Sequence, residues 1–274
     1  MRNDIPSFVK WAGGKKQLLE QFKPLFPKKI NRYFEPFMGG GAVAFYIIKN
    51  YNPKEIFLSD INEELVNCLN MIKTNVEDLI QELKKLKQLH NKETYLKIRA
   101  EDPMLLSQLT RAARFIYLNK TCFNGLYRVN SKNQFNVPMG SYKNPTICAE
   151  EELKEISKLL KNATIEVKQF YESVKEAKKD DFVYFDPPYY PLNKTSSFTS
   201  YTKDAFLEKE QEHLAKVFRE LDKKGCKVML SNSDTQFINN LYNEYNVSVV
   251  KATRMINSDA TKRGKVNEVA VNNY

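Results

Sequence analysis

Histidines and closely spaced cysteines are scarce in this chain of 274 residues. It has two histidines, His90 and His213, and its four cysteines, at positions 68, 122, 148 and 226, form no Cys-x-x-Cys pair. Zinc sites and disulfide frameworks need such clusters, and a Ser/His/Asp triad needs a histidine beside its nucleophile. We therefore expect chemistry without histidine and without a bound metal.

Long apolar runs are also absent. The longest, residues 41–48, is far shorter than the roughly 20 residues of a membrane-spanning helix. Mean hydropathy is −0.54. The segment Met1–Pro6 carries charges and a proline where a signal peptide has its apolar stretch. These features predict a cytoplasmic protein that makes no membrane contact.

Positive charge is in excess, with 43 Lys and Arg against 33 Asp and Glu and a net charge of +10. Basic side chains that neutralise phosphates release counterions, so this excess favours a polyanionic partner such as a nucleic acid. A lysine-rich composition is also typical of well-solvated surfaces. Charge alone therefore does not identify the partner.

Short apolar runs that alternate with helical patterns predict an α/β fold. Residues Lys15–Phe22 favour a helix. A strand at Arg32–Phe34, a glycine turn, an apolar helix ending at Ile48 and a strand at Glu55–Ser59 then form a βαβ unit. After Glu150 the alternation returns. The further predicted elements are strands at Thr164–Val167, Phe182–Phe185, Lys227–Leu230, Val247–Val250 and Val266–Asn272, and a helix at Lys203–Leu221.

The middle of the chain has a different pattern. From Asn62 to about Lys120 it is helical, with leucines at positions 79, 83, 86 and 89 at the spacing of one helix face. Between Phe123 and Tyr142, glycine, asparagine and proline separate short β-prone pieces, which predicts a hairpin or an exposed loop. The simplest architecture is a doubly wound sheet formed by residues 1–61 and 149–274, interrupted by an inserted unit at 62–148.

The segment Glu35–Gly41 ends a predicted strand and opens a helix with three glycines. Glycine lets the backbone approach a ligand closely, and a helix N-terminus offers N–H groups. Asp60 closes the next strand, where a carboxylate can accept hydrogen bonds from ribose hydroxyls. This pattern predicts an adenosine-bearing cofactor. Gly39, Gly41 and Ala44 also satisfy a dinucleotide fingerprint, so an NAD-dependent oxidoreductase is a second hypothesis, and a turn that only packs helix on strand is a third.

The sequence Asp-Pro-Pro-Tyr at residues 186–189 directly follows the apolar strand Phe182–Phe185. This order puts a carboxylate at the carboxyl edge of the sheet, where open α/β folds bind their ligands. The two prolines stiffen the turn and remove two backbone donors, so carbonyl acceptors face the site. A pocket rich in acceptors suits an incoming NH2 group.

An exocyclic amine such as adenine N6 is a poor nucleophile, because its lone pair is delocalised into the ring. If the Asp186 carboxylate and the Pro187 carbonyl each accept one of its hydrogens, the nitrogen is pushed toward a tetrahedral form and its lone pair can point at a sulfonium methyl group. Tyr189 would stack on the base, an interaction worth ~1–3 kcal/mol. We therefore assign catalytic roles to Asp186, Pro187 and Tyr189.

With these motifs in this order, the sequence resembles the Dam-type, alpha-group DNA adenine-N6 methyltransferases over nearly its whole length. Phe8–Lys15 is similar to the family's N-terminal cofactor motif and Tyr33–Gly41 to its glycine motif. The resemblance implies a Rossmann-like doubly wound α/β methyltransferase sheet that binds S-adenosylmethionine. The mainly helical insert at 62–148 would then be a DNA-recognition unit that carries a β-hairpin.

The resemblance also implies the cofactor contacts. Trp11 and Lys15 would lie at the methionine end of S-adenosylmethionine, Asp60 at its ribose and Phe170 at its adenine. The full set is Trp11, Lys15, Phe37, Gly39, Gly41, Asp60, Phe170 and Asp186. Where the family usually has Asp-Phe, this chain has Gln169-Phe170, so a carboxylate bond to the adenine amine is absent; the glutamine carbonyl is a substitute acceptor.

DNA recognition is implied by a segment, residues 123–138, that is similar to the recognition hairpin of GATC-reading members. Arg128 would contact a guanine edge, Leu126 and Pro138 would contact thymine, and Phe123 and Asn124 would wedge into the opened duplex. The expected DNA-binding residues are Lys10, Phe123, Asn124, Leu126, Arg128, Asn136, Pro138, Ser197 and Thr199. The last two belong to a Ser/Thr-rich segment, residues 195–201, that is similar to a phosphate-gripping loop. A polar hairpin and a linker without DNA contacts are the alternatives.

The implied partner is double-stranded DNA, and the target adenine must be flipped out of the stack to reach Asp186. The implied protein is a monomer or weak dimer of a prokaryotic or phage-infected cell, acting within a restriction-modification system or alone. Methylation of cytosine N4 or of a protein glutamine remains an alternative. So do the oxidoreductase, which leaves residues 186–189 unexplained, and a non-catalytic DNA-binding protein, which would be expected to have lost that motif.

Overall fold

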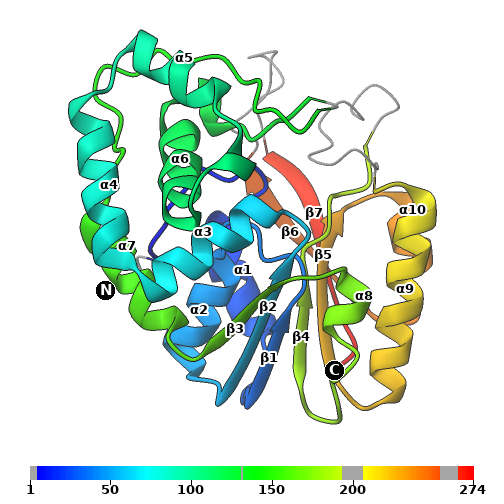
Figure 1. Ribbon diagram of the computed structural model, residues 1–274. Coiled ribbons are helices and arrows are strands. Elements are labelled where there is room, and N and C mark those ends of the chain that lie inside the picture. Colours follow the sequence, from blue (N-terminus) through cyan, green and yellow to red (C-terminus); the bar gives the residue numbers. More distant parts are fainter. Residues whose placement is uncertain (1–4, 131, 193–205, 254–264) are drawn as a thin grey trace.

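A seven-stranded sheet forms the centre of the computed structural model, which describes residues 5–130, 132–192, 206–253 and 265–274 (Figure 1). The strand order is β3-β2-β1-β4-β5-β7-β6. The strands are β1 (Arg32–Glu35), β2 (Glu55–Asp60), β3 (Ala163–Val167), β4 (Phe182–Phe185), β5 (Lys227–Ser233), β6 (Asn246–Thr253) and β7 (Lys265–Asn272). Neighbours from β3 to β5 are parallel, whereas β7 is antiparallel to both β5 and β6. The predicted doubly wound α/β sheet is confirmed, with its order reversing between β1 and β4.

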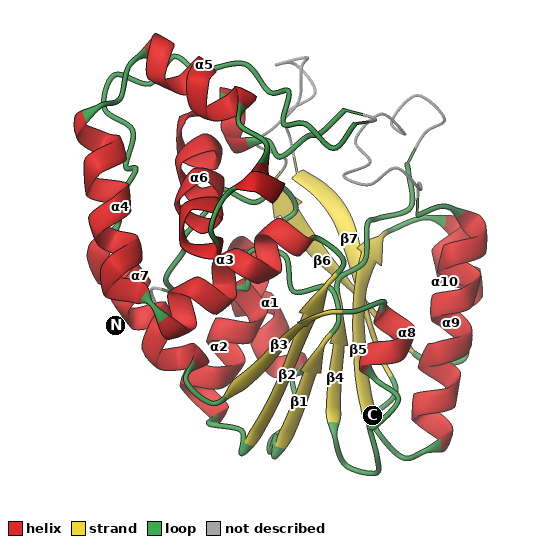
Figure 2. Ribbon diagram, in the orientation of Figure 1, coloured by secondary structure: helices red, strands yellow, loops and turns green. Residues whose placement is uncertain are grey.

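Helices cover both faces of this sheet because alternate strand residues point to opposite sides. Tyr33, Phe182 and Tyr184 join the apolar cluster that includes helices of the N-terminal and middle regions, while Phe34 and Val183 join a second cluster. Figure 2 shows the corresponding two layers, with α8, α9 and α10 on the side opposite α1, α2 and α3. These helices are α1 (Leu19–Phe22), α2 (Ala42–Tyr51), α3 (Glu63–Thr74), α8 (Phe170–Ser173), α9 (Glu208–Lys223) and α10 (Gln236–Leu241).

The N-terminal helix lies against the edge strand β6. The predicted helix at Lys15–Phe22 is present, but its first turn, Lys15–Leu18, is a 3-10 helix. Gln17 Nε2 donates to the Thr253 carbonyl (3.2 Å) and Gln17 Oε1 accepts from the Thr253 N–H (3.0 Å). One turn later, Gln21 makes the same pair of bonds to Lys251, at 3.0 and 2.9 Å. Two glutamine amides thus pair with the backbone of β6 as a neighbouring strand would.

The middle region is helical, as predicted, and shares the apolar cluster of the sheet. Its helices are α4 (Val76–Gln88), α5 (Lys92–Ala100) and α6 (Gln108–Thr121), followed by α7 (Glu150–Leu160). Leu79 and Leu83 are fully buried on α4, but the expectation for Leu89 is wrong. That residue lies just past the helix end and is 61% exposed, because α4 stops at Gln88.

Three further expectations on element bounds are corrected. The strand predicted to end at Leu230 continues to Ser233, and the strand predicted at Val247–Val250 spans Asn246–Thr253. The helix predicted from Lys203 begins at Glu208 instead, because Leu207 has an extended backbone and its N–H donates to the Glu210 side chain (3.1 Å), which closes the first turn. Between Phe123 and Tyr142, where the sequence predicts a hairpin or an exposed loop, the described residues form an antiparallel loop held by isolated bridges rather than by a continuous ladder. These bridges join Cys122 to Met139 and Val129 to Phe135. No helix of the described residues is long and apolar enough to cross a membrane.

Candidate functional site

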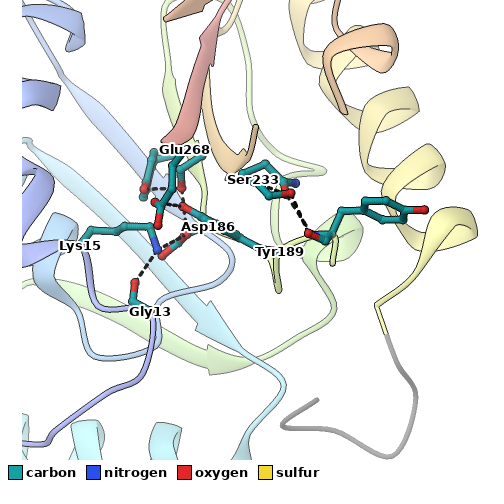
Figure 3. A network of polar contacts seen from close by, with 10 residues as sticks. Gly13, Lys15, Asp186, Tyr189, Ser233 and Glu268 are labelled. Atoms are coloured by element: carbon teal, nitrogen blue, oxygen red, sulfur yellow. Dashed lines mark hydrogen bonds and ion pairs between the residues drawn. The ribbon is translucent and has the colours of Figure 1, made fainter. Parts of the chain in front are cut away.

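Asp186 lies at the carboxyl edge of the sheet, directly after β4, as the sequence predicts. Its Oδ1 atom forms an ion pair with the ammonium of Lys15 (2.8 Å) and accepts a hydrogen bond from Ser231 Oγ (2.8 Å) (Figure 3). Lys15 is 5% exposed and also donates to the Gly13 carbonyl. Three distant segments of the chain therefore meet at one carboxylate oxygen.

The remaining acceptors of the Asp-Pro-Pro-Tyr loop fall into two groups. The Pro188 carbonyl accepts from Gln211 Nε2 (2.9 Å) and the Tyr190 carbonyl from Ser233 Oγ (2.7 Å). Within the described part of the chain, by contrast, no residue donates to Asp186 Oδ2 or to the Pro187 carbonyl. Among the described residues, the segment is thus fixed by the Pro188 and Tyr190 carbonyls, while Asp186 Oδ2 and the Pro187 carbonyl accept no hydrogen bond.

Tyr189 is anchored by Lys15 and by Glu268. Its hydroxyl donates to Glu268 Oε2 on β7 (2.9 Å), and the Lys15 ammonium lies 4.6 Å from the centre of its ring. The cation over the ring face is an attractive cation–π geometry. The ring is therefore held at both its face and its hydroxyl end.

Burial shifts the acids of this region toward their neutral forms. Desolvation raises the pKa of Asp186, although the charge and hydrogen bonds of Lys15 and Ser231 oppose it. Glu35 at the end of β1 is 2% exposed and accepts from the Tyr33 hydroxyl (2.5 Å). Its burial raises its pKa well above the usual value despite that bond. The ionised form of Asp186 thus depends on stabilisation by Lys15 and Ser231.

The glycine turn between β1 and α2 is shaped by Trp11. A Cβ atom added to Gly39 would lie 2.7 Å from Trp11 Nε1, and one added to Gly40 would lie 2.8 Å from Trp11 Cβ. Gly39 and Gly41 also have positive φ angles, of 49° and 73°. Glycine is needed here because the indole and the left-handed backbone both exclude a side chain.

Asp60 at the end of β2 ties the glycine turn to the next helix. Its Oδ2 accepts from the Gly39 N–H and its Oδ1 from the Asn62 N–H, both at 3.0 Å. Burial raises the pKa of Asp60, and these backbone donors lower it. Each carboxylate oxygen has a second lone pair, so ribose hydroxyls remain possible donors to it.

Apolar side chains border the same edge of the sheet. The rings of Phe37 and Phe170 stack with centroids 5.4 Å apart, and Phe206 meets both edge-on. Ile61, next to Asp60, is 43% exposed. Gln169 is also exposed, and its side chain does not cap α8. A carboxylate, a glycine turn without side chains and this apolar wall fit an adenosine-bearing cofactor.

The residues predicted to bind DNA lie mostly on exposed loops. Phe123 is 51% exposed, and its N–H donates to the Pro138 carbonyl (2.9 Å), which brings these two predicted contacts together. Arg128 is exposed and its Nε donates to Asn136 Oδ1 (2.6 Å). The guanidinium is thus oriented by a second residue of the predicted set.

The other predicted DNA contacts are more varied. The Lys10 ammonium lies 3.7 Å from the centre of the Tyr142 ring, and its backbone is held by Asn119. Asn124 has a left-handed backbone (φ 55°), and Leu126 is half-buried. The predicted contacts Ser197 and Thr199 lie outside the described residues.

Sequence reasoning missed several residues of the site. Ser231, Tyr184 and Glu268 stand on β5, β4 and β7, and no local motif marks them; Ile61 had a signal, since it directly follows the acidic end of β2. In the described ranges no cluster of His, Cys, Asp or Glu is arranged to hold a metal ion.

The chain is similar to known proteins over its whole length. The family profile described as D12 class N6 adenine-specific DNA methyltransferase matches residues 11–256. Type II methyltransferase M.MjaIII of Methanocaldococcus jannaschii is 47% identical, covering 99% of this chain and 100% of that protein. Type II methyltransferase M1.LlaDCHI of Lactococcus lactis subsp. cremoris is 46% identical, with 99% and 96% covered. The DNA adenine methylase of Vibrio cholerae is 37% identical, with 96% and 94% covered.

Proposed function

The chain belongs to the D12 class of N6 adenine-specific DNA methyltransferases, and from that premise we propose that it methylates adenine in the duplex sequence GATC, with Asp186, Pro187 and Tyr189 as the catalytic residues. The family implies S-adenosylmethionine as the methyl donor and DNA as the substrate. Family membership also removes the dinucleotide-dependent oxidoreductase from consideration.

The observation that carries the catalytic assignment is the pair of acceptors at Asp186 Oδ2 and the Pro187 carbonyl. An adenine N6 amine has two hydrogens, and these two acceptors can take one each. Holding both hydrogens draws the nitrogen lone pair out of conjugation with the ring and directs it away from the loop. As the carbon–nitrogen bond forms and the carbon–sulfur bond of the donor breaks, the Asp186 carboxylate would stabilise the positive charge on nitrogen until one of its hydrogens leaves as a proton.

The cofactor residues follow from the same edge of the sheet. S-adenosylmethionine supplies an electrophilic methyl group on its sulfonium. We assign Asp60 to its ribose hydroxyls and Phe37, Phe170 and Ile61 to its adenine. The contacts of Gly39 and Gly40 with Trp11 support a close backbone approach beside these groups. Lys15, predicted at the methionine end, would act there while paired with Asp186.

Recognition of GATC is assigned to the exposed residues Lys10, Phe123, Asn124, Arg128 and Pro138 and to the half-buried Leu126 and Asn136. A guanidinium that a neighbour already orients loses less entropy on binding, so the Arg128–Asn136 bond supports a bidentate contact to a guanine edge. Because Asp186 cannot reach a stacked base, the adenine is flipped out, and exposed Phe123 is suited to fill the gap. Ser197 and Thr199 are proposed to hold the backbone phosphates.

The biological setting and assembly remain part of the proposal. Two relatives at 46–47% identity carry the name Type II methyltransferase, which supports a role beside a restriction nuclease. We propose that residues 1–61 and 149–274 form the catalytic unit and 62–148 the target-recognition unit, acting as a monomer or weak dimer on double-stranded DNA.

The test is methylation of a defined plasmid by the wild-type protein and by Asp186→Ala, read by single-molecule sequencing. We expect N6-methyladenine at every GATC with the wild type and none with the variant, while the variant still binds S-adenosylmethionine and DNA. Methylation in another sequence context would overturn the GATC assignment. Full turnover by Asp186→Ala would overturn the catalytic one.

A further inference from the structure

Ser231 on β5 is the meeting point of a buried chain of hydroxyl groups. Its Oγ lies 2.8 Å from the Tyr184 hydroxyl and 2.8 Å from Asp186 Oδ1. Ser231 and Tyr184 are both fully buried, and they stand on the adjacent strands β5 and β4. These are two of the groups that sequence reasoning did not anticipate.

The direction of this chain of hydrogen bonds is fixed by the number of hydrogens. A serine hydroxyl has one hydrogen, and an ionised carboxylate can only accept, so Ser231 must donate to Asp186. Tyr184 must then donate to Ser231. Burial and the nearby Asp186 charge raise the pKa of Tyr184 well above its usual value, so it keeps its proton. The donors run from Tyr184 through Ser231 to Asp186.

Both donors to Asp186 use the same oxygen. Lys15 approaches Oδ1 from the N-terminal segment and Ser231 approaches it from β5. The terminal torsion of an aspartate is broad and roughly two-fold, so a carboxylate with one partner can turn and offer either oxygen. Two donors from different directions remove that freedom.

We propose that Ser231, oriented by Tyr184, is a positioning residue that locks Asp186 Oδ1 beside Lys15 and thereby presents Oδ2 to the target amine. This inference rests on the proposed catalytic role of Asp186. Without Ser231 the carboxylate rotates, and the acceptor pair formed by Oδ2 and the Pro187 carbonyl is no longer preformed. The other residues assigned above to the cofactor and to DNA are expected to keep their positions.

The test compares Ser231→Ala, Tyr184→Phe and the double variant with matched controls. Ser59→Ala and Tyr242→Phe remove buried hydroxyls of the same kinds, and neither hydroxyl has a hydrogen-bond partner in the described structure. Thermal denaturation and cofactor binding, followed by fluorescence of the single tryptophan, Trp11, check that each variant is folded.

For Ser231→Ala we expect kcat to fall by about 10- to 100-fold, the size of loss that a small misplacement of a catalytic group causes, with KM for DNA and S-adenosylmethionine within about twofold of wild type. Tyr184→Phe should lose less, and adding it to Ser231→Ala should cost little more, because the two act in series. Both controls should keep wild-type kcat.

Four outcomes would count against the proposal. It is wrong if kcat of Ser231→Ala matches that of Ser59→Ala, or if the loss appears in KM alone. The relay from Tyr184 is wrong if the two losses multiply in the double variant. If Ser231→Ala does not fold, Tyr184→Phe decides, since kcat equal to that of Tyr242→Phe contradicts the relay. Activity of Asp186→Ala reports separately on the proposed function.

Discussion

At the scale of single residues, the ionisation of Asp186 connects the site to pH. Its pKa is raised by burial and lowered most by Lys15. In the proposed mechanism the ionised carboxylate is the form that accepts a hydrogen from the amine, so activity should be lost as pH falls through that raised pKa. Removing Lys15 removes the main opposing effect.

We therefore expect Lys15→Met to move the acid limb of the kcat profile to higher pH and to lower kcat at neutral pH. The measurement is single-turnover methylation between about pH 5 and 9. Lys29→Met, at an exposed position, is the control and should keep the wild-type profile. An unchanged acid limb in Lys15→Met would show that Lys15 does not set the ionisation of Asp186.

Glu35 gives a prediction about stability. Its folded-state pKa lies well above the unfolded value of 4.5, so the folded state binds this proton more tightly. The stabilisation is then fully present below the unfolded pKa and is lost as pH rises through the folded pKa.

Glu35→Gln keeps an acceptor for Tyr33 but cannot ionise. Its stability relative to wild type should rise from pH 5 to pH 8 in urea denaturation. Glu93→Gln, at an exposed site, should show no such trend, and a flat difference for Glu35→Gln would refute the assignment.

Arg128 gives a prediction about specificity. We expect Arg128→Ala to reduce discrimination at one base pair of GATC by about 1–3 kcal/mol, as for loss of a bidentate base contact. The measurement is kcat/KM on duplexes with single substitutions in the site. Lys132→Ala, exposed in the same loop, should leave discrimination intact. An equal loss on all sequences would instead make Arg128 a phosphate contact.

The sequence predicts residues of this site only where a local motif surrounds them. Asp186, Asp60 and Gly39 follow strand ends, and position along the chain is enough to place them at one edge of the sheet. The pairing of Lys15 with Asp186 and the role of Ser231 depend on which distant strands become neighbours. No spacing in the sequence encodes that information.

At the scale of elements, the fully buried strands were predicted most closely, whereas β5 and β6 each extend three residues beyond their predicted C-terminal ends. Apolar β-prone runs such as Phe182–Phe185 match their strand bounds, because burial on both faces requires an unbroken apolar segment. Helix ends depend on side-chain caps, and the Glu210 bond to Leu207 moved the start of α9 away from the predicted position. The turn residues between positions 123 and 142 also do not indicate how few regular strand pairings that loop contains.

The turn between β1 and α2 allows a test of close approach. Gly39→Ala and Gly13→Ala both place alanine at a positive φ, which costs about 1–2 kcal/mol. Only at Gly39 does the added Cβ collide with Trp11; at Gly13 the nearest atom, Lys15 Nζ, is 3.8 Å away. We expect Gly39→Ala to lose more stability in thermal denaturation, to shift the Trp11 fluorescence and to weaken cofactor binding. Equal behaviour of the two variants would contradict this role for Trp11.

At the scale of the whole molecule, the insert and the sheet share one apolar cluster. Leu69 on α3, Leu83 on α4 and Phe115 on α6 pack in the same cluster as Ile56 of β2. The proposed catalytic unit (1–61 and 149–274) and target-recognition unit (62–148) are therefore distinguished by sequence order and proposed roles. The sequence also did not predict that β7 lies between β5 and β6 and runs antiparallel to both, because the order of strands in a sheet depends on tertiary contacts.

A shared core predicts cooperative unfolding. We expect the urea transition followed by Trp11 fluorescence, which reports on the N-terminal segment, to coincide with the transition in far-ultraviolet circular dichroism, which is dominated by the helices. Addition of cofactor should move both curves together. Two separated transitions would show that the insert unfolds as an independent unit.

The glutamines that pair with β6 have a consequence for how copies of this protein meet. An edge strand with unpaired backbone groups invites another chain to add a strand, and a basic protein concentrated along DNA meets its own copies often. Gln17 and Gln21 occupy those backbone groups at Lys251 and Thr253 with side chains of the same molecule. The same short helix that brings Lys15 to Asp186 thus also keeps this stretch of the sheet from becoming a template for aggregation.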